Sequence, residues 1–411
     1  MANTIHHANR SVAHATSTTV YLTLGQRSAS YEAAEALAVV TSRVSSTFKN
    51  LYARVIANTI TATTTVRFRV NLANGNQVLS VGASTTGEFE DNVNTDSVIS
   101  GDEWNANFVT GGTGTTITFS FIGVLSSGPN TYAWYSNIGG DISSASVTTY
   151  AAIGGFSGVT GTVEADKQLR MKTAGTAKNL KVITGTNNRT TNTVFRSRVN
   201  GANGAQTFTI AGGTTGFFDD SSNTDTLAVD DLLNISITTG TGTEILDCIY
   251  AGMDLETTNN GEQLLSSSNA GLTVTTGLTR FIILTGRMDA NTTELDTRAE
   301  VNVSCLLSKL AAYVSANTIV EDSTLRLRKN GANANQVVPL TGLTTGYFED
   351  GVNTDSFVET DEGNYSLVTG ATGTNIVIQS VSMLLTFQVL MNQWYRPIEQ
   401  RRKEPVEMVA Y

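Results

Sequence analysis

A chain of 411 residues is longer than one hydrophobic core supports, so several domains are expected. With 40% hydrophobic and 15% charged residues, 37 glycines and only 4 prolines, the composition favours short strands joined by tight turns and excludes a disordered chain. The net charge of −10 argues against nucleic acid as a partner, and no apolar run approaches the roughly 18 residues of a membrane span.

Residues 1–20 precede the part of the chain that repeats, and we expect them to form an N-terminal arm. The arm holds the only three histidines, His6, His7 and His14, but no apolar core of the length that a secretory signal needs. We therefore expect a protein that is made in a host cytoplasm. Because no histidine recurs later in the chain, a catalytic triad or a histidine metal cluster is not expected, and we predict that the protein is not an enzyme.

The rest of the chain repeats itself three times, with an offset of 129 residues from Arg67 to Arg196 and of 130 residues from Arg196 to Arg326. The same register extends backwards to Tyr21 and Tyr150. Self-similarity at a fixed period is the signature of tandem modules. We predict modules at 21–149, 150–279 and 280–391, followed by a C-terminal arm at 392–411.

Each copy is expected to consist of strands and turns. Residues 30–40 alone resemble a helix, but the equivalent segments 159–169 and 289–299 carry Gly161 and β-branched residues, so we expect a loop and strand with one helical turn at most. Apolar residues then alternate with polar ones, as at Val66 and Phe68 against Arg67, which is typical of a half-buried antiparallel strand. Turns rich in Asn and Gly follow at 71–75, 200–204 and 330–334, and Gly-rich turns at 110–115, 239–243 and 369–374.

Strands of this number and spacing predict an all-β fold of three tandem antiparallel β-sandwich modules of the jelly-roll type. The Arg-x-Arg strand, the Asn-Gly-Ala-Asn turn, the Thr-Gly-x-Phe-x-Asp segment and the Asn-Thr-Asp turn resemble the jelly-roll modules of tailed-phage virion proteins, which are similar to the C1q and tumour-necrosis-factor group. This resemblance covers most of residues 21–390. It implies modules that pack in threefold clusters, so the chain is expected to form either a pseudo-trimer by itself or a linear array that oligomerises.

Two arginines lie on one face of the same strand in every copy, where they are candidates for contacts between copies or subunits. The alternative is a solvated strand face, where such charges contribute little. The residues concerned are Arg67 and Arg69, Arg196 and Arg198, and Arg326 and Arg328.

An acidic segment also recurs. Clustered carboxylates bind Ca²⁺, but Asp and Asn also cap turns through their own side chains, and we favour the turn interpretation. The weak calcium candidates are Asp91, Asp96, Asp220, Asp225, Asp350 and Asp355. No other cofactor is expected. Cys248 and Cys305 are too few for a disulfide framework and are expected to be buried thiols.

Aromatic and basic residues outside the repeat are further interface candidates. Trp134 lies between the first two modules and is expected in a packed intermodule seam. Trp394, Arg401 and Arg402 lie in the C-terminal arm, which is expected to dock on a neighbour.

These features together predict a non-enzymatic structural protein of a tailed-phage virion, as a capsid decoration or vertex protein or as a tail or fibre component. Its partners would be other virion proteins or copies of itself. The alternatives are an adhesin that binds a host-surface glycan and the subunit of a self-assembling extracellular filament. Neither nucleic acid nor a membrane is expected as a partner.

Overall fold

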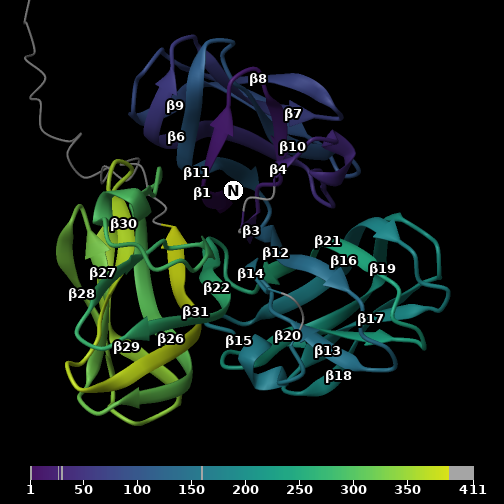
Figure 1. The fold of residues 1–411 in the computed structure, drawn as a ribbon, viewed down its shortest axis with the longest axis vertical. Helices are drawn as coiled ribbons and strands as arrows, with labels where there is room; N and C mark the ends of the chain where they lie inside the picture. The colour runs from purple at the N-terminus through teal and green to yellow at the C-terminus, as the bar shows by residue number, and fades with distance from the viewer. Residues whose placement is uncertain (1, 26, 29–30, 159–160, 388–411) are drawn as a thin grey trace, which may run out of the picture.

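The computed structural model describes residues 2–25, 27–28, 31–158 and 161–387, and these residues form strands, turns and three short 3-10 helices with no α-helix. Three modules of similar shape lie around a common centre (Figure 1). Each module is a sandwich of antiparallel sheets, so the all-β jelly-roll architecture expected from the sequence is confirmed.

The elements of the three modules correspond one to one, apart from an additional short strand, β4, in the first. Module 1 contains β1 (Ala2–Ala15), β2 (Thr19–Leu22), β3 (Arg27–Ser28), β4 (Tyr31–Glu32), η1 (Glu35–Leu37), β5 (Val40–Thr41), β6 (Ser46–Ile60), β7 (Thr64–Val70), β8 (Ala73–Val81), β9 (Gly87–Val98), β10 (Glu103–Val109) and β11 (Gly114–Gly128). Module 2 contains β12 (Thr131–Ile142), β13 (Thr148–Ala151), β14 (Gly155–Phe156), η2 (Glu164–Lys167), β15 (Leu169–Arg170), β16 (Gly175–Asn187), β17 (Thr193–Val199), β18 (Ala202–Ile210), β19 (Gly216–Leu227), β20 (Leu232–Thr239) and β21 (Leu246–Thr257). Module 3 contains β22 (Glu262–Thr275), β23 (Thr279–Ile282), β24 (Gly286–Arg287), η3 (Glu294–Thr297), β25 (Ala299–Glu300), β26 (Cys305–Ile319), β27 (Ser323–Lys329), β28 (Ala332–Leu340), β29 (Gly346–Phe357), β30 (Glu362–Val368) and β31 (Gly373–Phe387).

Eight main strands in each module form two four-stranded sheets. The first sheet has the order β1-β11-β6-β9 in module 1, β12-β21-β16-β19 in module 2 and β22-β31-β26-β29 in module 3. The second sheet has the order β2-β10-β7-β8 and its equivalents β13-β20-β17-β18 and β23-β30-β27-β28. Neighbours in a sheet that are far apart in sequence, such as β1 and β11, reflect the long connections of a jelly roll.

The local sequence explains the strands and their turns. In β7, Val66 and Phe68 are buried while the intervening arginines are partly exposed, as the period-two pattern predicts. The hairpin that follows turns through two residues with positive φ, Asn71 and Leu72, and modules 2 and 3 place Asn-Gly there. Positive φ at both positions is the geometry of the turn that matches the twist of antiparallel strands.

The helix-like segment at 30–40 contains only the 3-10 turn η1, and η2 and η3 occupy the equivalent places. The prediction of one helical turn at most is therefore confirmed. Each turn carries a glutamate that binds an arginine of the strand beside it, as Glu35 binds Arg69. That ion pair holds the 3-10 turn against the sheet.

The predicted module boundaries are wrong by one strand. Residues 2–15 are not an arm but the strand β1, which pairs with β11 from Ala2 opposite Gly128 to Ala15 opposite Thr116. Likewise 131–142 and 262–275 are the first strands of modules 2 and 3, so modules starting at 21, 150 and 280 each lack their own first strand. Most of residues 125–149 and 255–280 accordingly lie in strands.

The modules close into a ring instead of a line. The core of module 1 includes Tyr250 of module 2, the core of module 2 includes Leu264 of module 3, and the core of module 3 includes Ile5 of module 1. Each module therefore completes the core of the previous one, and the third returns to the first. This cyclic relation, visible in Figure 1, is that of a pseudo-threefold axis within one chain.

Candidate functional site

Three equivalent short strands meet where the modules join. β3 pairs with β1, β14 with β12 and β24 with β22, each in parallel and at the same register. β3, β14 and β24 also contact one another pairwise, and β14 pairs with β3 through Gly155 and Arg27. A Cβ atom on Gly155 would lie 2.3 Å from the carbonyl oxygen of Gly286, so the close approach of the backbones requires glycine there.

Three seams radiate from this centre, and we call them the first seam (module 1 with module 2), the second (module 2 with module 3) and the third (module 3 with module 1). At the first seam, the guanidinium of Arg43 forms an ion pair with Asp219 and lies 5.8 Å from the ring centre of Phe217. The hydroxyl of Tyr250 donates a hydrogen bond to the carbonyl oxygen of Val39 at 2.8 Å. Charged and apolar contacts therefore hold this seam together.

The second seam repeats the ion pair in the same register. Lys172, which is equivalent to Arg43, places its Nζ 2.7 Å from Oε2 of Glu349, which is equivalent to Asp219. Arg170 lies 5.5 Å from the ring centre of Tyr347, as Arg43 does from Phe217. Burial lowers the pKa of the Lys172 ammonium, and its contact with Glu349 acts in the opposite direction. This buried ammonium depends on a single carboxylate across the seam.

The third seam lacks that ion pair. The position of Arg43 and Lys172 is occupied by Asn302, and the position of Asp219 and Glu349 by Glu90. Both polar atoms of the Asn302 amide are buried without a hydrogen-bond partner among the described residues. A contact of another kind crosses this seam: Arg54 of module 1 binds Glu362 of module 3, and it also binds Glu88 of its own module.

Buried polar contacts near the axis also join modules 1 and 3. The Ile5 amide donates to the side chain of Gln263 at 2.9 Å, and the amide of Gln263 donates to the Ile5 carbonyl at 2.8 Å. Nδ1 of His7 lies 2.9 Å from the hydroxyl of Thr285. Burial lowers the pKa of both His6 and His7 to about 3, so both rings are neutral at pH 7. The histidines thus belong to the first strand of module 1 and not, as expected, to an arm before it.

Trp134 lies in the second seam. Its indole is buried and donates to the hydroxyl of Ser266 at 3.2 Å. The sequence placed Trp134 between the modules, whereas the structure places it within β12 of module 2, with module 3 as its neighbour. Trp394, Arg401 and Arg402 lie outside the described residues.

The paired arginines do not serve as contacts between modules in the way the sequence suggested. The second arginine of each pair binds a glutamate of its own module: Arg69 with Glu35, Arg198 with Glu164 and Arg328 with Glu294. The same three arginines also bind the Asn of the adjacent hairpin. Arg67, Arg196 and Arg326 lie on the same strand face and are half-buried, and Arg326 donates to the Ala334 carbonyl of its own module. The contacts described for these arginines therefore lie within each module, and a role between subunits stays a prediction.

The recurrent aspartates bind backbone amides at the turn they follow. Asp91 accepts from the N–H groups of Val78, Val93 and Asn94, and these bonds hold its pKa below the ordinary value although burial acts in the opposite direction. Asp96 accepts from the N–H of Asn76. The equivalent bonds are made by Asp220, Asp225, Asp350 and Asp355. These bonds support the turn interpretation, and no group of three or more potential metal ligands occurs within the described residues.

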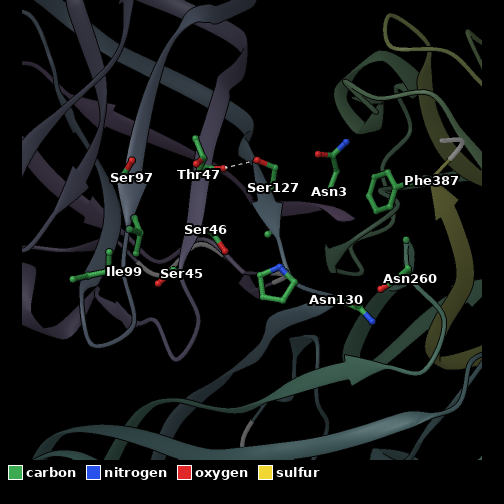
Figure 2. Close-up of a pocket in the computed structure, with 14 residues that line it drawn as sticks. Asn3, Ser45, Ser46, Thr47, Ser97, Ile99, Ser127, Asn130, Asn260 and Phe387 are labelled. Atoms are coloured by element: carbon green, nitrogen blue, oxygen red, sulfur yellow. Dashed lines mark hydrogen bonds between the residues drawn. The ribbon is translucent and has the colours of Figure 1, made fainter. Parts of the chain in front are cut away.

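A pocket of about 840 Å³ opens where module 1 meets the connectors between the modules. Figure 2 shows hydroxyl and amide side chains around it, with Ser127 donating to the Thr47 carbonyl at 3.4 Å. The lining contains no charged side chain. Its residues are Asn3, Ser45, Ser46, Thr47, Ser97, Val98, Ile99, Ser127, Gly128, Pro129, Asn130, Asn260, Gly261 and Phe387.

Two further properties concern the rest of the chain. Cys248 and Cys305 are both buried thiols, as expected, and burial raises the pKa of the Cys305 thiol to about 12. Among the residues that the structure describes, no helix is long and apolar enough to cross a membrane.

The seam residues were not identified from the sequence. A usable signal exists in the repeat register, because positions 41, 170 and 300 hold Thr, Arg and Glu, and positions 90, 219 and 349 hold only acids. The change of charge at 41, 170 and 300 marks a position where the neighbour differs between copies. The acids at 90, 219 and 349 give no such signal, because they recur in every copy as the arginines with intramodule partners do.

No protein-family model and no curated protein sequence matches the chain. Solved structures similar to it include a chain of the Sulfolobus turreted icosahedral virus, with 12% identity over 86% of this chain and 83% of that one, at a TM-score of 0.20. A second belongs to the triple jelly-roll fold and turret assembly of an archaeal virus (11% identity, 93% and 91%, TM-score 0.20). A third is a Paenibacillus xanthan lyase (14% identity, 82% and 32%, TM-score 0.20). At these TM-scores the architecture described above rests on this chain's own strand pairing.

Proposed function

We propose that the protein is a non-enzymatic structural component of a virion and acts through protein–protein contacts. The observation that carries this proposal is the closed ring of three jelly-roll modules in a single chain. A subunit of this kind presents three similar outer faces around one axis, which suits repeated contacts with a symmetric assembly. The sequence resemblance to virion modules of tailed phages points to a capsid decoration or vertex protein, or to a tail or fibre component.

The edge strands of the second sheets also support a role in a specific assembly. β8, β18 and β28 are the edge strands of the second sheets, and each has backbone N–H groups that are occupied by the recurrent aspartates. Unprotected edges pair with other strands without specificity. Where the aspartates already bind the N–H groups of an edge strand, another strand cannot pair with those groups. Association then depends on side-chain contacts, which suits a protein that takes a defined position in a particle.

The first test is peptide mass spectrometry of density-banded virus particles from the source, with the copy number measured against the major capsid protein. We expect the protein in the particles, at high copy number for a decoration protein and at low copy number for a tail or fibre component. Its absence from particles, together with its presence in cell-surface fractions, would contradict the proposal.

Glycan binding is a second candidate, favoured by the uncharged pocket of hydroxyl and amide side chains. Its volume lies within the range of small-molecule sites, and such side chains match the hydroxyl groups of a sugar. Phe387 in its wall is buried, so stacking would be limited. Glycan-array binding that Asn130→Ala abolishes would support this candidate. Loss of glycan binding on adding a chelator would indicate that the weak calcium candidates bind a metal ion.

A further inference from the structure

The third seam carries an excess of negative charge that the other two seams do not have. Glu300 occupies the position of Thr41 and Arg170, and Glu88 that of Phe217 and Tyr347. Across this seam Glu300 of module 3 lies near Glu88 and Glu90 of module 1, and Asn302 stands two residues further along the chain. At the equivalent positions the second seam has Arg170 and Lys172 against Tyr347 and Glu349. Two basic residues have therefore been lost, and one acid has been gained on each side.

The charges around this cluster do not balance. Arg54 binds Glu88 at 2.6 Å and also binds Glu362, while Arg298 lies 3.3 Å from Glu362 and 3.7 Å from Glu294. Among the described residues no ion pair reaches Glu90, Glu300 or Glu359. We call Glu88, Glu90, Glu300 and Glu359 the acidic cluster.

The electrostatics of the cluster agree with a missing cation. Burial, followed by Glu88 and Glu90, raises the pKa of Glu300 to about 7, with Glu359 adding to the rise and Arg54 acting against it. Burial, followed by Glu359 and Glu88, also raises the pKa of Glu90. Like charges held close together without a counter-charge have this effect.

Asn302 supplies an independent sign that a partner belongs here. It is 2% exposed, and neither its amide nitrogen nor its oxygen has a hydrogen-bond partner among the described residues. Buried polar groups are nearly always satisfied in folded proteins. From the equivalent positions Arg43 and Lys172 reach an acid across their seams.

A basic segment of the same chain begins within reach of the cluster. Phe387, the last described residue, pairs with Cys305, and Cys305 pairs with Phe357, two residues before Glu359. With about 5 Å between paired strands and about 3.3 Å per residue, Glu359 lies within ~17 Å of Phe387. The nine residues from 388 to Arg396 extend up to about 30 Å. Arg401, Arg402 and Lys403 follow, so the run 396–403 holds four basic residues and one acid.

We propose that the basic run 396–403 of the chain's own C-terminal segment docks on the acidic cluster and supplies the positive charge that Arg43 and Lys172 supply at the other two seams. The ring would then be closed electrostatically at all three seams. This inference concerns the isolated protein and does not depend on a role in virions.

The test is hydrogen–deuterium exchange of the full chain, compared with a variant in which Arg396, Arg401, Arg402 and Lys403 are replaced by Gln. We expect exchange to accelerate by about fivefold at low salt in peptides covering 86–92 and 298–303. The equivalent peptides 215–221 and 345–351, at the first and second seams, serve as internal controls and should not change. Replacing Glu399, Glu404 and Glu407 by Gln alters the same segment without removing its basic residues and should not accelerate exchange.

Asn302→Lys provides the decisive second arm, because it places the missing cation in the seam itself. In that background, neutralising the four basic residues should no longer alter exchange at the third seam. Unchanged exchange on neutralisation in the wild-type background, or equal acceleration at all three seams, would overturn the proposal. Acceleration that depends on protein concentration would also overturn it, because it would assign the docked segment to a second copy.

Discussion

The second and third seams are built from the same positions of the same repeat, yet they are stabilised differently. At the second seam the buried ammonium of Lys172 forms an ion pair with the more exposed Glu349, and a short connector joins the two modules. At the third seam Asn302 and Glu90 occupy the corresponding positions without an ion pair among the described residues, and Arg54, Gln263 and His7 provide polar contacts. Equivalent folds therefore do not imply equivalent interfaces. The residue at an equivalent seam position differs with the residues that it meets in the neighbouring module.

Acidification should have the largest effect on the free energy of unfolding, because two buried histidines become protonated: His7 lies in the third seam and His6 lies beside it. With folded pKa values of about 3 against about 6.5 when unfolded, the unfolded state binds more protons, so stability is complete above pH 6.5 and falls as the pH decreases toward 3. The expected loss is about 2 kcal/mol per histidine at pH 5. Urea unfolding between pH 5 and 8 measures it.

Glu300 acts in the opposite direction over the same pH range. Its raised pKa means that its favourable protonated form is lost as the pH rises through about 7, so its contribution falls with increasing pH. A His6→Gln, His7→Gln double variant should therefore become more stable on acidification from pH 8 to 5, whereas the wild type becomes less stable. The same pH dependence in both proteins would show that the histidines do not stay neutral in the folded chain.

Removing the cation of the second seam should make it resemble the third. Lys172→Met removes the ion pair between the buried Lys172 ammonium and Glu349, whose side chain is 27% exposed, and should lower the free energy of unfolding by about 1 kcal/mol. Arg170→Met is the matched control, since Arg170 is about a third exposed and should cost well under about 1 kcal/mol. Denaturant unfolding measures both. Equal losses would indicate that the ion pair contributes nothing beyond packing.

Adding a cation to the third seam should make it resemble the second. Asn302→Lys is expected to raise the free energy of unfolding by about 1 kcal/mol and to move the pKa of Glu300 back toward its ordinary value. Carboxyl titration by NMR measures the pKa shift. A variant that is less stable than the wild type, with the pKa of Glu300 unchanged, would contradict the equivalence of Asn302 and Lys172.

The smallest expected effect concerns a hairpin turn outside the seams. It measures a local contribution to stability that does not depend on contacts between modules. Leu72 has a φ of 62°, where modules 2 and 3 place glycine. Leu72→Gly should stabilise module 1 by about 0.5 kcal/mol, because relief of backbone strain exceeds the entropic cost of glycine. Gly201→Leu should reverse the effect in module 2, where a side chain meets no atom within 4 Å. Thermal unfolding distinguishes them.

Features that depend on neighbours in sequence were predictable from the chain alone. The repeat period, the all-β class, the positive-φ hairpins such as Asn200-Gly201 and the single helical turn before each arginine strand follow from patterns that a few adjacent residues specify. The turn role of Asp91 and its equivalents was predictable for the same reason, since an aspartate caps amides close to it in sequence.

Only the tertiary structure decided the module boundaries, the ring and the seams. The first strands β1, β12 and β22 place His7, Tyr135 and Ser266 at one equivalent position, and their sequences share no repeat because each strand lies at the axis and contacts a different module. Arg69, Arg198 and Arg328 repeat together with their partners Glu35, Glu164 and Glu294. A repeated sequence specifies what every module needs in order to fold, whereas the residues that join modules must differ, and their partners are more than a hundred residues away in the chain.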